Sequence, residues 1–234
     1  MIVGNGMLAN SFRHLFENSE DVLIFASGVS NSRETDEREF RKESELLQAS
    51  LHGGAKRFVY FSSCGISAGE ETPYFRHKSA MERLVMDRRG GVVFRLPQVV
   101  GHGGNPKTLT NFLYSSILDG SHFSVLESAE RNLIDLDHIT DIVNRLITDP
   151  PANCIPIMSE KSMRVIEIVR IFEEVLGRKA NIDMIPGGIP MPSDTRLIAS
   201  VSTELGIDLT GNYAERVLRK YYRNAADSTS WTLT

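Results

Sequence analysis

Largely apolar runs, each long enough for only one strand, alternate with amphipathic stretches over the first hundred residues. This alternation constrains the fold more than any other feature of the chain. The runs are residues 2–3, 22–26, 58–61 and 92–96. Every position of the run at 22–26 is apolar, as in a strand that is covered on both faces. Alternating strands and helices predict an α/β fold, with helices on both faces of a doubly wound parallel sheet.

Three helices are expected between these strands. The first follows from apolar residues at helical spacing over 8–16, the second is a charged helix over 34–51, and the third runs from Pro73 to about residue 89. Thr72 fits the N-cap of the third helix, because its hydroxyl can accept a backbone hydrogen bond, and Pro73 fits the first turn. The side chains of the second helix that we expect to face inward are Phe40, Leu46, Leu47 and Leu51.

The chain beyond residue 100 is less regular and predicts a smaller second domain. Helices are expected over residues 109–118, 138–147, 165–176, 195–205 and 213–223, with one strand at 154–158. We assign residues 1–100 to the first domain, with about 125–150 returning to it, and residues 101–124 and 151–224 to the second. The polar composition of residues 225–234 predicts a flexible tail.

Composition and charge argue against several classes of partner. The chain has 234 residues, enough for one large domain with an appendage, and its net charge of −4 without a basic cluster argues against nucleic acid. No apolar run approaches the roughly 20 residues that span a bilayer, so we expect no membrane partner. Two cysteines, Cys64 and Cys154, do not make a disulfide framework, which favours the cytoplasm. The histidines are scattered, so we expect no metal.

A glycine-rich turn connects the first strand to the first helix and could bind a phosphate. Gly4 and Gly6 are followed by Ala9, which gives the pattern Gly-x-Gly-x-x-Ala. Glycines at these positions let the backbone approach a pyrophosphate, and the N-terminus of the following helix attracts its negative charge. Because so short a pattern is weakly specific, a plain glycine turn at the start of a helix is the alternative.

The stretch after this turn is short for a complete dinucleotide-binding fold. In that fold a strand beyond the turn normally ends with an acidic residue that binds the adenosine ribose. Here the next strand ends with Ala26, Ser27 and Gly28, none of which is acidic. Either the strands on the adenine side are missing, or this strand has taken their place. Arg33 could meet a 2′-phosphate, although a solvated loop arginine is the simpler interpretation.

A serine at a strand end and a Tyr-x-x-x-Lys helix follow, in an order typical of hydride-transfer sites. Ser63 ends the third strand, whereas Tyr74 and Lys78 lie four residues apart and so share one face of the third helix. An ammonium beside a phenol favours the phenolate, so we expect Lys78 to lower the pKa of Tyr74. Ser63 would hydrogen-bond a substrate oxygen, and Tyr74 would exchange a proton as hydride moves to or from a nicotinamide. The alternative is an ordinary capped surface helix.

Together these motifs resemble an extended short-chain dehydrogenase/reductase of the nucleotide-sugar epimerase/dehydratase family, over nearly the whole chain. Residues 56–63 (KRFVYFSS) are similar to the active-site strand of that family, and residues 95–101 (RLPQVVG) to its Arg-x-x-Asn-Val-Tyr-Gly segment. Residues 131–139 (RNLIDLDHI) resemble the stretch whose arginine contacts the nucleotide. The resemblance implies a Rossmann-like cofactor domain, shortened on its adenine side, and a small C-terminal domain that binds the nucleotide sugar.

The resemblance also implies a role for each candidate residue. Those implied in binding NAD or NADP, without a preference between the two, are Gly4, Gly6, Met7, Leu8, Ala26, Ser27, Gly28, Ser62, Tyr74, Lys78, Pro97 and Val99. Those implied in catalysis are Ser63, Tyr74, Lys78 and Cys64. Gln98 and Arg131 would hold the substrate phosphates, and a guanidinium suits that role because it forks onto phosphate oxygens. A solvated salt bridge is the alternative for Arg131. A homodimer is possible, and Phe40, Leu46 and Leu84 would then either contribute to it or pack in the core.

The end of the active-site strand favours a reductase over a dehydratase. The 4,6-dehydratases of the family carry Thr-Asp-Glu there, whereas this chain has Ser63, Cys64 and Gly65 and lacks the acid-base pair for eliminating water. Residues 62–64 (SSC) resemble GDP-fucose synthase, in which the cysteine exchanges a proton; a packed, inert thiol is an equal alternative. The resemblance thus implies reduction, or epimerisation and reduction, of a 4-keto nucleotide sugar. The alternatives are a sugar 4-epimerase with bound NAD and a non-catalytic, NAD(P)-binding regulatory protein.

Overall fold

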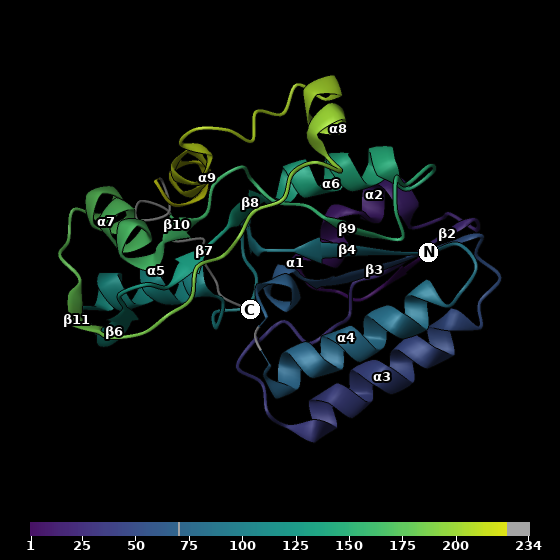
Figure 1. The fold of residues 1–234 in the computed structure, drawn as a ribbon, viewed down its shortest axis with the longest axis horizontal. Coiled ribbons are helices and arrows are strands. Elements are labelled where there is room, and N and C mark those ends of the chain that lie inside the picture. Colours follow the sequence, from purple (N-terminus) through teal and green to yellow (C-terminus); the bar gives the residue numbers. More distant parts are fainter. Residues whose placement is uncertain (70, 224–234) are drawn as a thin grey trace. The chain divides into compact units, whose positions relative to one another are not determined.

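The computed structural model describes residues 1–69 and 71–223 (Figure 1) and divides the chain into two compact units. The first unit consists of Met1–Leu96, Leu136–Ile157 and Asp194–Ile207. The second consists of Pro97–Asp135, Met158–Ser193 and the chain from Asp208 onward. The tail predicted at residues 225–234 lies outside the described residues. The chain therefore leaves the first unit after Leu96 and comes back to it twice, over residues 136–157 and 194–207.

A five-stranded parallel sheet forms the centre of the first unit, in the order β1-β2-β3-β4-β9. All neighbouring strands in it run parallel. Its strands are β1 (Ile2–Val3), β2 (Val22–Phe25), β3 (Arg57–Ser63), β4 (Gly91–Leu96) and β9 (Cys154–Pro156). This arrangement confirms the predicted α/β fold with a parallel sheet, and the four predicted N-terminal strands all form.

The order of these strands explains the short stretch after the glycine turn. In a doubly wound dinucleotide-binding sheet the order is 3-2-1-4-5-6, so two strands lie beyond the first one. Here β1 is the edge strand, and within residues 1–69 and 71–223 no strand pairs with its outer side. Of the two alternatives from the sequence, the strands on the adenine side are therefore missing, which confirms the predicted shortening.

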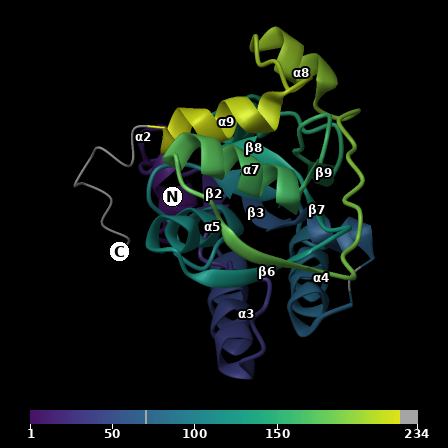
Figure 2. The same cartoon turned by 90° about the vertical axis from the view of Figure 1, so that its left-hand side faces the viewer.

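Helices cover both faces of the sheet. The pair α3 (Glu37–Leu51) and α4 (Pro73–Met86) pack against each other, and α4 also packs on β3 and β4. Figures 1 and 2 both show α3 and α4 side by side. The opposite face is covered by α1 (Met7–Ser11), α2 (Arg13–Phe16) and α6 (Leu136–Leu146), with α8 (Ala199–Glu204) packed on α6.

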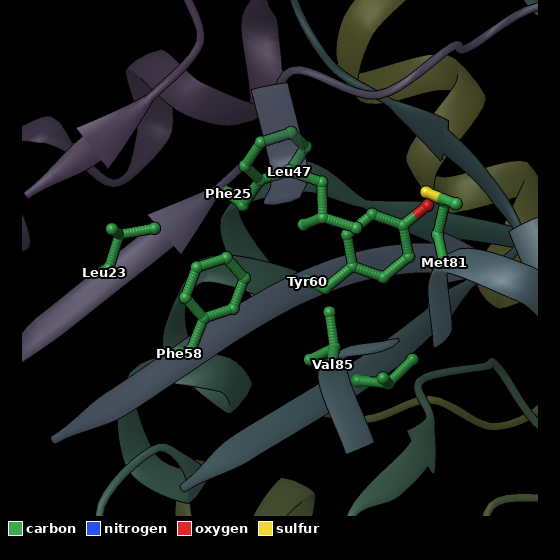
Figure 3. Close-up of a cluster of buried hydrophobic side chains, with 8 residues drawn as sticks. Leu23, Phe25, Leu47, Phe58, Tyr60, Met81 and Val85 are labelled. Carbon is green, nitrogen blue, oxygen red and sulfur yellow. The ribbon is translucent and has the colours of Figure 1, made fainter. Parts of the chain in front are cut away.

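A cluster of buried side chains lies between the sheet and the α3–α4 layer (Figure 3). Its members are Leu23, Phe25, Leu47, Phe58, Tyr60, Met81, Val85 and Val93. Leu47 is fully buried as expected, but the prediction that Leu46 faces inward is wrong, because its side chain is 41% exposed. One residue of helix turns the side chain by about 100°, so Leu46 points away from the face that Leu47 buries. Leu84 of α4 is also exposed, and the homodimer stays a prediction.

Up to residue 223, the second unit is built from three long helices and three small two-stranded sheets. The helices are α5 (Leu109–Asp119), α7 (Val165–Leu176) and α9 (Tyr213–Tyr222). The strand pairs are β5 (Gln98–Val100) with β8 (Leu133–Asp135), β6 (His122–Leu126) with β11 (Asn181–Ile185), and β7 (Glu130–Arg131) with β10 (Met163–Arg164). Buried Asp135 ties α9 to β8, because its carboxylate accepts hydrogen bonds from Tyr221 Oη at 2.6 Å and Lys220 Nζ at 2.8 Å.

Within the described part of the chain, no helix is long and apolar enough to cross a membrane. In the same part, no group of three or more His, Cys, Asp and Glu side chains could hold a metal ion.

Candidate active site

The carboxyl end of β3 and the first turns of α4 bring Ser63, Tyr74 and Lys78 together. Thr72 caps α4 as predicted, because its Oγ1 accepts a hydrogen bond from the Phe75 backbone N–H at 3.3 Å. Tyr74 and Lys78 then follow on one face of the helix, and both are buried. The Ser63 hydroxyl, which accepts a hydrogen bond from the Gly65 backbone N–H at 3.2 Å, lies close enough to the Tyr74 side chain to lower its pKa. Lys78 Nζ lies 5.9 Å from the centroid of the Tyr74 ring.

Lys78 is also engaged by a carboxylate that the sequence analysis did not single out. Its ammonium donates hydrogen bonds to Glu43 Oε1 at 2.9 Å and to Tyr60 Oη at 3.0 Å. The Tyr60 hydroxyl in turn donates to the same Glu43 oxygen at 2.6 Å. Glu43 and Lys78 are each 3% exposed. The two charges therefore form a buried ion pair between α3 and α4, beside the hydroxyl of Tyr60.

The second oxygen of Glu43 holds the loop that follows β2. Glu43 Oε2 accepts a hydrogen bond from the Val29 backbone N–H at 2.7 Å. His77 Nε2 lies 3.1 Å from the same oxygen, although not aligned for a good hydrogen bond. Burial alone would raise the pKa of Glu43, but the Lys78 charge and the contacts with His77 and Tyr60 lower it to about 2. Glu43 is thus a carboxylate at neutral pH, and it links the loop to Lys78.

The ionisation of Glu43 predicts how stability depends on pH. Its pKa falls from 4.5 to about 2 on folding, so its contribution is complete above pH 5 and is lost as the pH falls towards 2. The full contribution is on the order of 3 kcal/mol. The difference in unfolding free energy between the unmodified protein and Glu43→Gln should therefore shrink between pH 6 and pH 3, measured by urea denaturation. A constant difference over that range would contradict the prediction.

Gly28 leaves no space for a side chain above this ion pair. A Cβ atom built on Gly28 would lie 2.5 Å from Lys78 Nζ and 2.8 Å from Glu43 Oε1. The predicted cofactor residue Gly28 therefore packs directly on the charged groups, and its lack of a side chain is a steric requirement. The loop that follows β2 thus packs on Lys78 at Gly28.

We expect Gly28→Ala to destabilise the protein, because the methyl group must push the loop or the Lys78 ammonium out of place. The cost should be about 1–3 kcal/mol, as for other overpacked sites, and is measurable by urea denaturation. The control is Gly6→Ala, because no atom lies within 4 Å of the added Cβ atom. Gly69→Ala would not serve as a control, because Gly69 has a positive φ and any side chain there strains the backbone. Equal stabilities of Gly28→Ala and Gly6→Ala would contradict the packing described above.

The prediction that Lys78 lowers the pKa of Tyr74 is wrong. Burial of the phenol raises its pKa, the charge of Glu43 raises it further, and only the interaction with the Ser63 side chain lowers it. The physical reason is that the carboxylate of Glu43 neutralises the ammonium which was expected to favour the phenolate. Tyr74 is therefore a protonated phenol at neutral pH.

Cys64 has the surroundings of a packed thiol. It begins the short 3₁₀ helix η1 (Cys64–Ala68), whose N-cap is Ser63, and its Sγ donates to the Arg95 carbonyl oxygen at 3.2 Å. Burial raises the pKa of Cys64 to about 12, despite the nearby Arg95 charge. A thiol with that pKa exchanges protons poorly at neutral pH, which favours the inert alternative.

Cys64→Ser should keep turnover within about threefold of the unmodified protein, because serine can donate the same hydrogen bond to Arg95 and no proton transfer is lost. Steady-state kinetics with a nucleotide sugar that the protein turns over would measure this. A loss of more than a hundredfold, with an unchanged melting temperature, would instead restore Cys64 as an acid-base group.

The predicted cofactor residues of the first unit lie around the carboxyl ends of β1, β2 and β3. Gly4 has φ +125°, and a Cβ there would lie 2.5 Å from the Ala26 carbonyl oxygen, so the glycine turn packs closely on the loop after β2. Ser62 is 6% exposed, and within residues 1–69 and 71–223 its hydroxyl has no hydrogen-bond partner. An unpaired buried hydroxyl is costly unless a ligand or water satisfies it. These residues fit the nicotinamide side of a dinucleotide, whereas the adenosine side lacks its strands.

The remaining candidates belong to the second unit. Pro97 is its first residue, and Gln98 and Val99 form the start of β5. Arg131 lies in β7, where its Nη1 donates to the Glu130 carbonyl oxygen at 2.6 Å. The binding roles of these residues stay predictions.

Sequence reasoning missed Glu43, Tyr60 and His77. One signal was present, because Glu43 lies three residues after Phe40 and four before Leu47 and so shares their side of the helix. A charged residue on the apolar side of an amphipathic helix indicates a buried partner.

Comparison with solved structures identifies the fold. MoeE5 in complex with UDP-glucuronic acid and NAD is similar, with a TM-score of 0.69 and 17% identity over 88% of this chain and 79% of that one. The dTDP-glucose 4,6-dehydratase from Bacillus anthracis in complex with NAD has a TM-score of 0.68 and 12% identity, over 97% and 80%. UDP-glucuronic acid 4-epimerase from Bacillus cereus, in complex with UDP-glucuronic acid and NAD, has a TM-score of 0.66 and 17% identity, over 95% and 79%.

Two of these neighbours are a nucleotide-sugar 4,6-dehydratase and a nucleotide-sugar 4-epimerase, each in complex with NAD, which confirms the resemblance at the level of the fold. No protein-family model matches the sequence, and no curated protein matches it.

Proposed function

We propose that this chain is an NAD(P)-dependent oxidoreductase that reduces, or epimerises and reduces, a 4-keto nucleotide sugar. The observation that carries the proposal is the buried Tyr74 hydroxyl beside Ser63 at the carboxyl end of β3, with Lys78 one helical turn away. Open parallel sheets bind their ligands at this end of the strands. Neighbours of the same fold in complex with NAD and UDP-glucuronic acid or UDP-glucose support the substrate class.

The side chains of this site suit the donation of a proton to a carbonyl oxygen. The nicotinamide, when bound, supplies hydride to the carbonyl carbon. Tyr74 gives its phenolic proton to the carbonyl oxygen, which becomes the product hydroxyl, while Ser63 orients that oxygen and water later restores the proton to Tyr74. Because burial raises the pKa of Tyr74, the phenol is present across the neutral range. That protonation state suits reduction better than oxidation.

Lys78 and Glu43 act on Tyr74 through charge. The ammonium of Lys78 would stabilise the tyrosinate that proton transfer leaves behind, whereas Glu43 opposes that charge and holds Lys78 in place. Gln98 and Arg131 would bind the phosphates of the sugar nucleotide. A nucleotide-sugar 4-epimerase is less well supported, because its first step is an oxidation for which the phenolate is needed.

A non-catalytic, NAD(P)-binding protein is the second candidate. It is favoured by the pairing of Lys78 with Glu43, which occupies the lysine that a hydride-transfer site uses, and by the missing adenine-side strands.

The proposal is tested by offering the protein 4-keto nucleotide sugars with NADH or NADPH, and 4-hydroxy nucleotide sugars with NAD⁺ or NADP⁺, and following the absorbance of the reduced cofactor. Oxidation of cofactor with a 4-keto substrate supports the reductase. Binding of cofactor without turnover of any panel member supports the second candidate. Failure to bind either reduced cofactor at millimolar concentration would exclude both.

A further inference from the structure

We propose that this chain holds its cofactor through the nicotinamide mononucleotide half, and that the adenosine half adds little to binding. The inference rests on the proposed function, since it concerns the cofactor of the same site. It predicts that reduced nicotinamide mononucleotide (NMNH) serves nearly as well as NADH, and that NADH and NADPH bind alike.

The strand order removes the crevice in which an adenosine binds. Dinucleotides bind to doubly wound sheets across the point where the strand order reverses, with one mononucleotide on each half. In the order β1-β2-β3-β4-β9 the strands follow the sequence from one edge to the other, and there is no reversal. The sheet therefore contains one of the two halves. The other half would begin at β1, but here β1 is the edge strand.

The chain between the glycine turn and β2 leaves no room for the missing half. Helices α1 and α2 occupy residues 7–16, and β2 begins at Val22. A parallel crossover with its helix needs at least about 10–12 residues, and two further strands with their crossovers would need several times the five residues at 17–21. The acidic residue that holds an adenosine ribose at a strand end is also absent, because β2 is followed by Ala26 and Ser27.

The loop after β2 contacts buried charged groups of the first unit. The Val29 N–H is bonded to Glu43, and Gly28 packs on the Lys78–Glu43 pair. The Val29 N–H is therefore satisfied by the protein itself and is not free for a cofactor.

The groups expected on the nicotinamide side are retained at the end of β3. Ser62 lies two residues after Tyr60, so its side chain projects from the same face of the strand, towards α4. Its hydroxyl is buried and has no partner within the described chain. Ser63, the next residue along the chain, interacts with the Tyr74 side chain. A polar hydroxyl that only a ligand or water can satisfy is thus found on the nicotinamide side of the shortened sheet.

Binding, rather than activity, gives the direct test. NADH, NADPH and NMNH are titrated into the full chain, with the nicotinamide fluorescence as the readout, and ADP is added as a competitor. We expect the dissociation constant of NMNH to lie within about tenfold of that of NADH, which corresponds to about 1.4 kcal/mol. NADH and NADPH should agree within threefold, and millimolar ADP should displace neither.

Two variants locate the binding. Ser62→Ala should weaken NADH and NMNH by the same factor, whereas Arg33→Ala should leave NADH, NADPH and NMNH unchanged. Binding of NADH a hundredfold tighter than NMNH, displacement by ADP, or a loss of NADPH affinity alone in Arg33→Ala would overturn this inference and leave the proposed function intact. Binding of none of the three reduced nucleotides would overturn the proposed function itself.

Discussion

Glu43→Ala should destabilise the protein by about 3–5 kcal/mol, the cost of leaving a buried charge without its partner. The substitution removes the acceptor of three hydrogen bonds, from Lys78 Nζ, Tyr60 Oη and the Val29 N–H. The Lys78 side chain, which is 3% exposed, would then lose its counter-ion. Equilibrium denaturation by urea, followed by circular dichroism, measures the change.

The matched control for this variant is Glu39→Ala on the same helix. Glu39 pairs with Lys42 at 2.6 Å, but both side chains are largely exposed, and a surface pair of this kind contributes at most about 1 kcal/mol. A second comparison is Glu43→Leu combined with Lys78→Met, which removes both charges and should recover part of the loss in either single variant. Equal effects of the changes at residues 43 and 39 would show that the buried ion pair does not stabilise the fold.

Tyr74→Phe should lower turnover by roughly 10²–10⁴-fold, the usual contribution of a positioned proton donor. Phenylalanine fills the same buried space, so the fold should persist, and cofactor affinity should stay nearly unchanged. The measurements are steady-state kinetics on a 4-keto nucleotide sugar and a fluorescence titration with the reduced cofactor.

Tyr114→Phe provides the control for loss of a buried phenol elsewhere. Tyr114 is buried in the second unit, where its ring packs against Phe172 and Tyr222. Its replacement should affect stability more than turnover. Normal turnover by Tyr74→Phe would remove Tyr74 from the mechanism, whereas a parallel loss of cofactor binding would assign it a structural role.

The elements of the first unit could be predicted from the sequence because their signals are local. The apolar run at 22–26 became β2, and the Thr72-Pro73 cap set the start of α4. The small strands of the second unit gave only a weak signal. β6 (HFSVL) and β11 (NIDMI) alternate polar and apolar residues over their first four positions, but they lie about 60 residues apart, and so short an alternation does not indicate which strands pair.

The candidate site was predictable in part for the same reason. Tyr74 and Lys78 share one helix, and Ser63 lies close before it, so spacing alone brought them together. The partner that decides the charge of the site, Glu43, lies 35 residues before Lys78 in a helix rich in charged residues. Its burial depends on how α3 packs on α4, and no local pattern fixes that packing. The error in the expected pKa of Tyr74 followed directly from this missing carboxylate.

The edge position of β1 has a consequence for solubility. An exposed strand edge offers unpaired backbone groups on which another chain can add a strand and begin an aggregate, and proteins limit this hazard by keeping such edges very short. β1 is only two residues long. Because the sheet ends at this short strand, it exposes fewer unpaired backbone N–H and C=O groups than a sheet that ended at the longer β2 or β3 would.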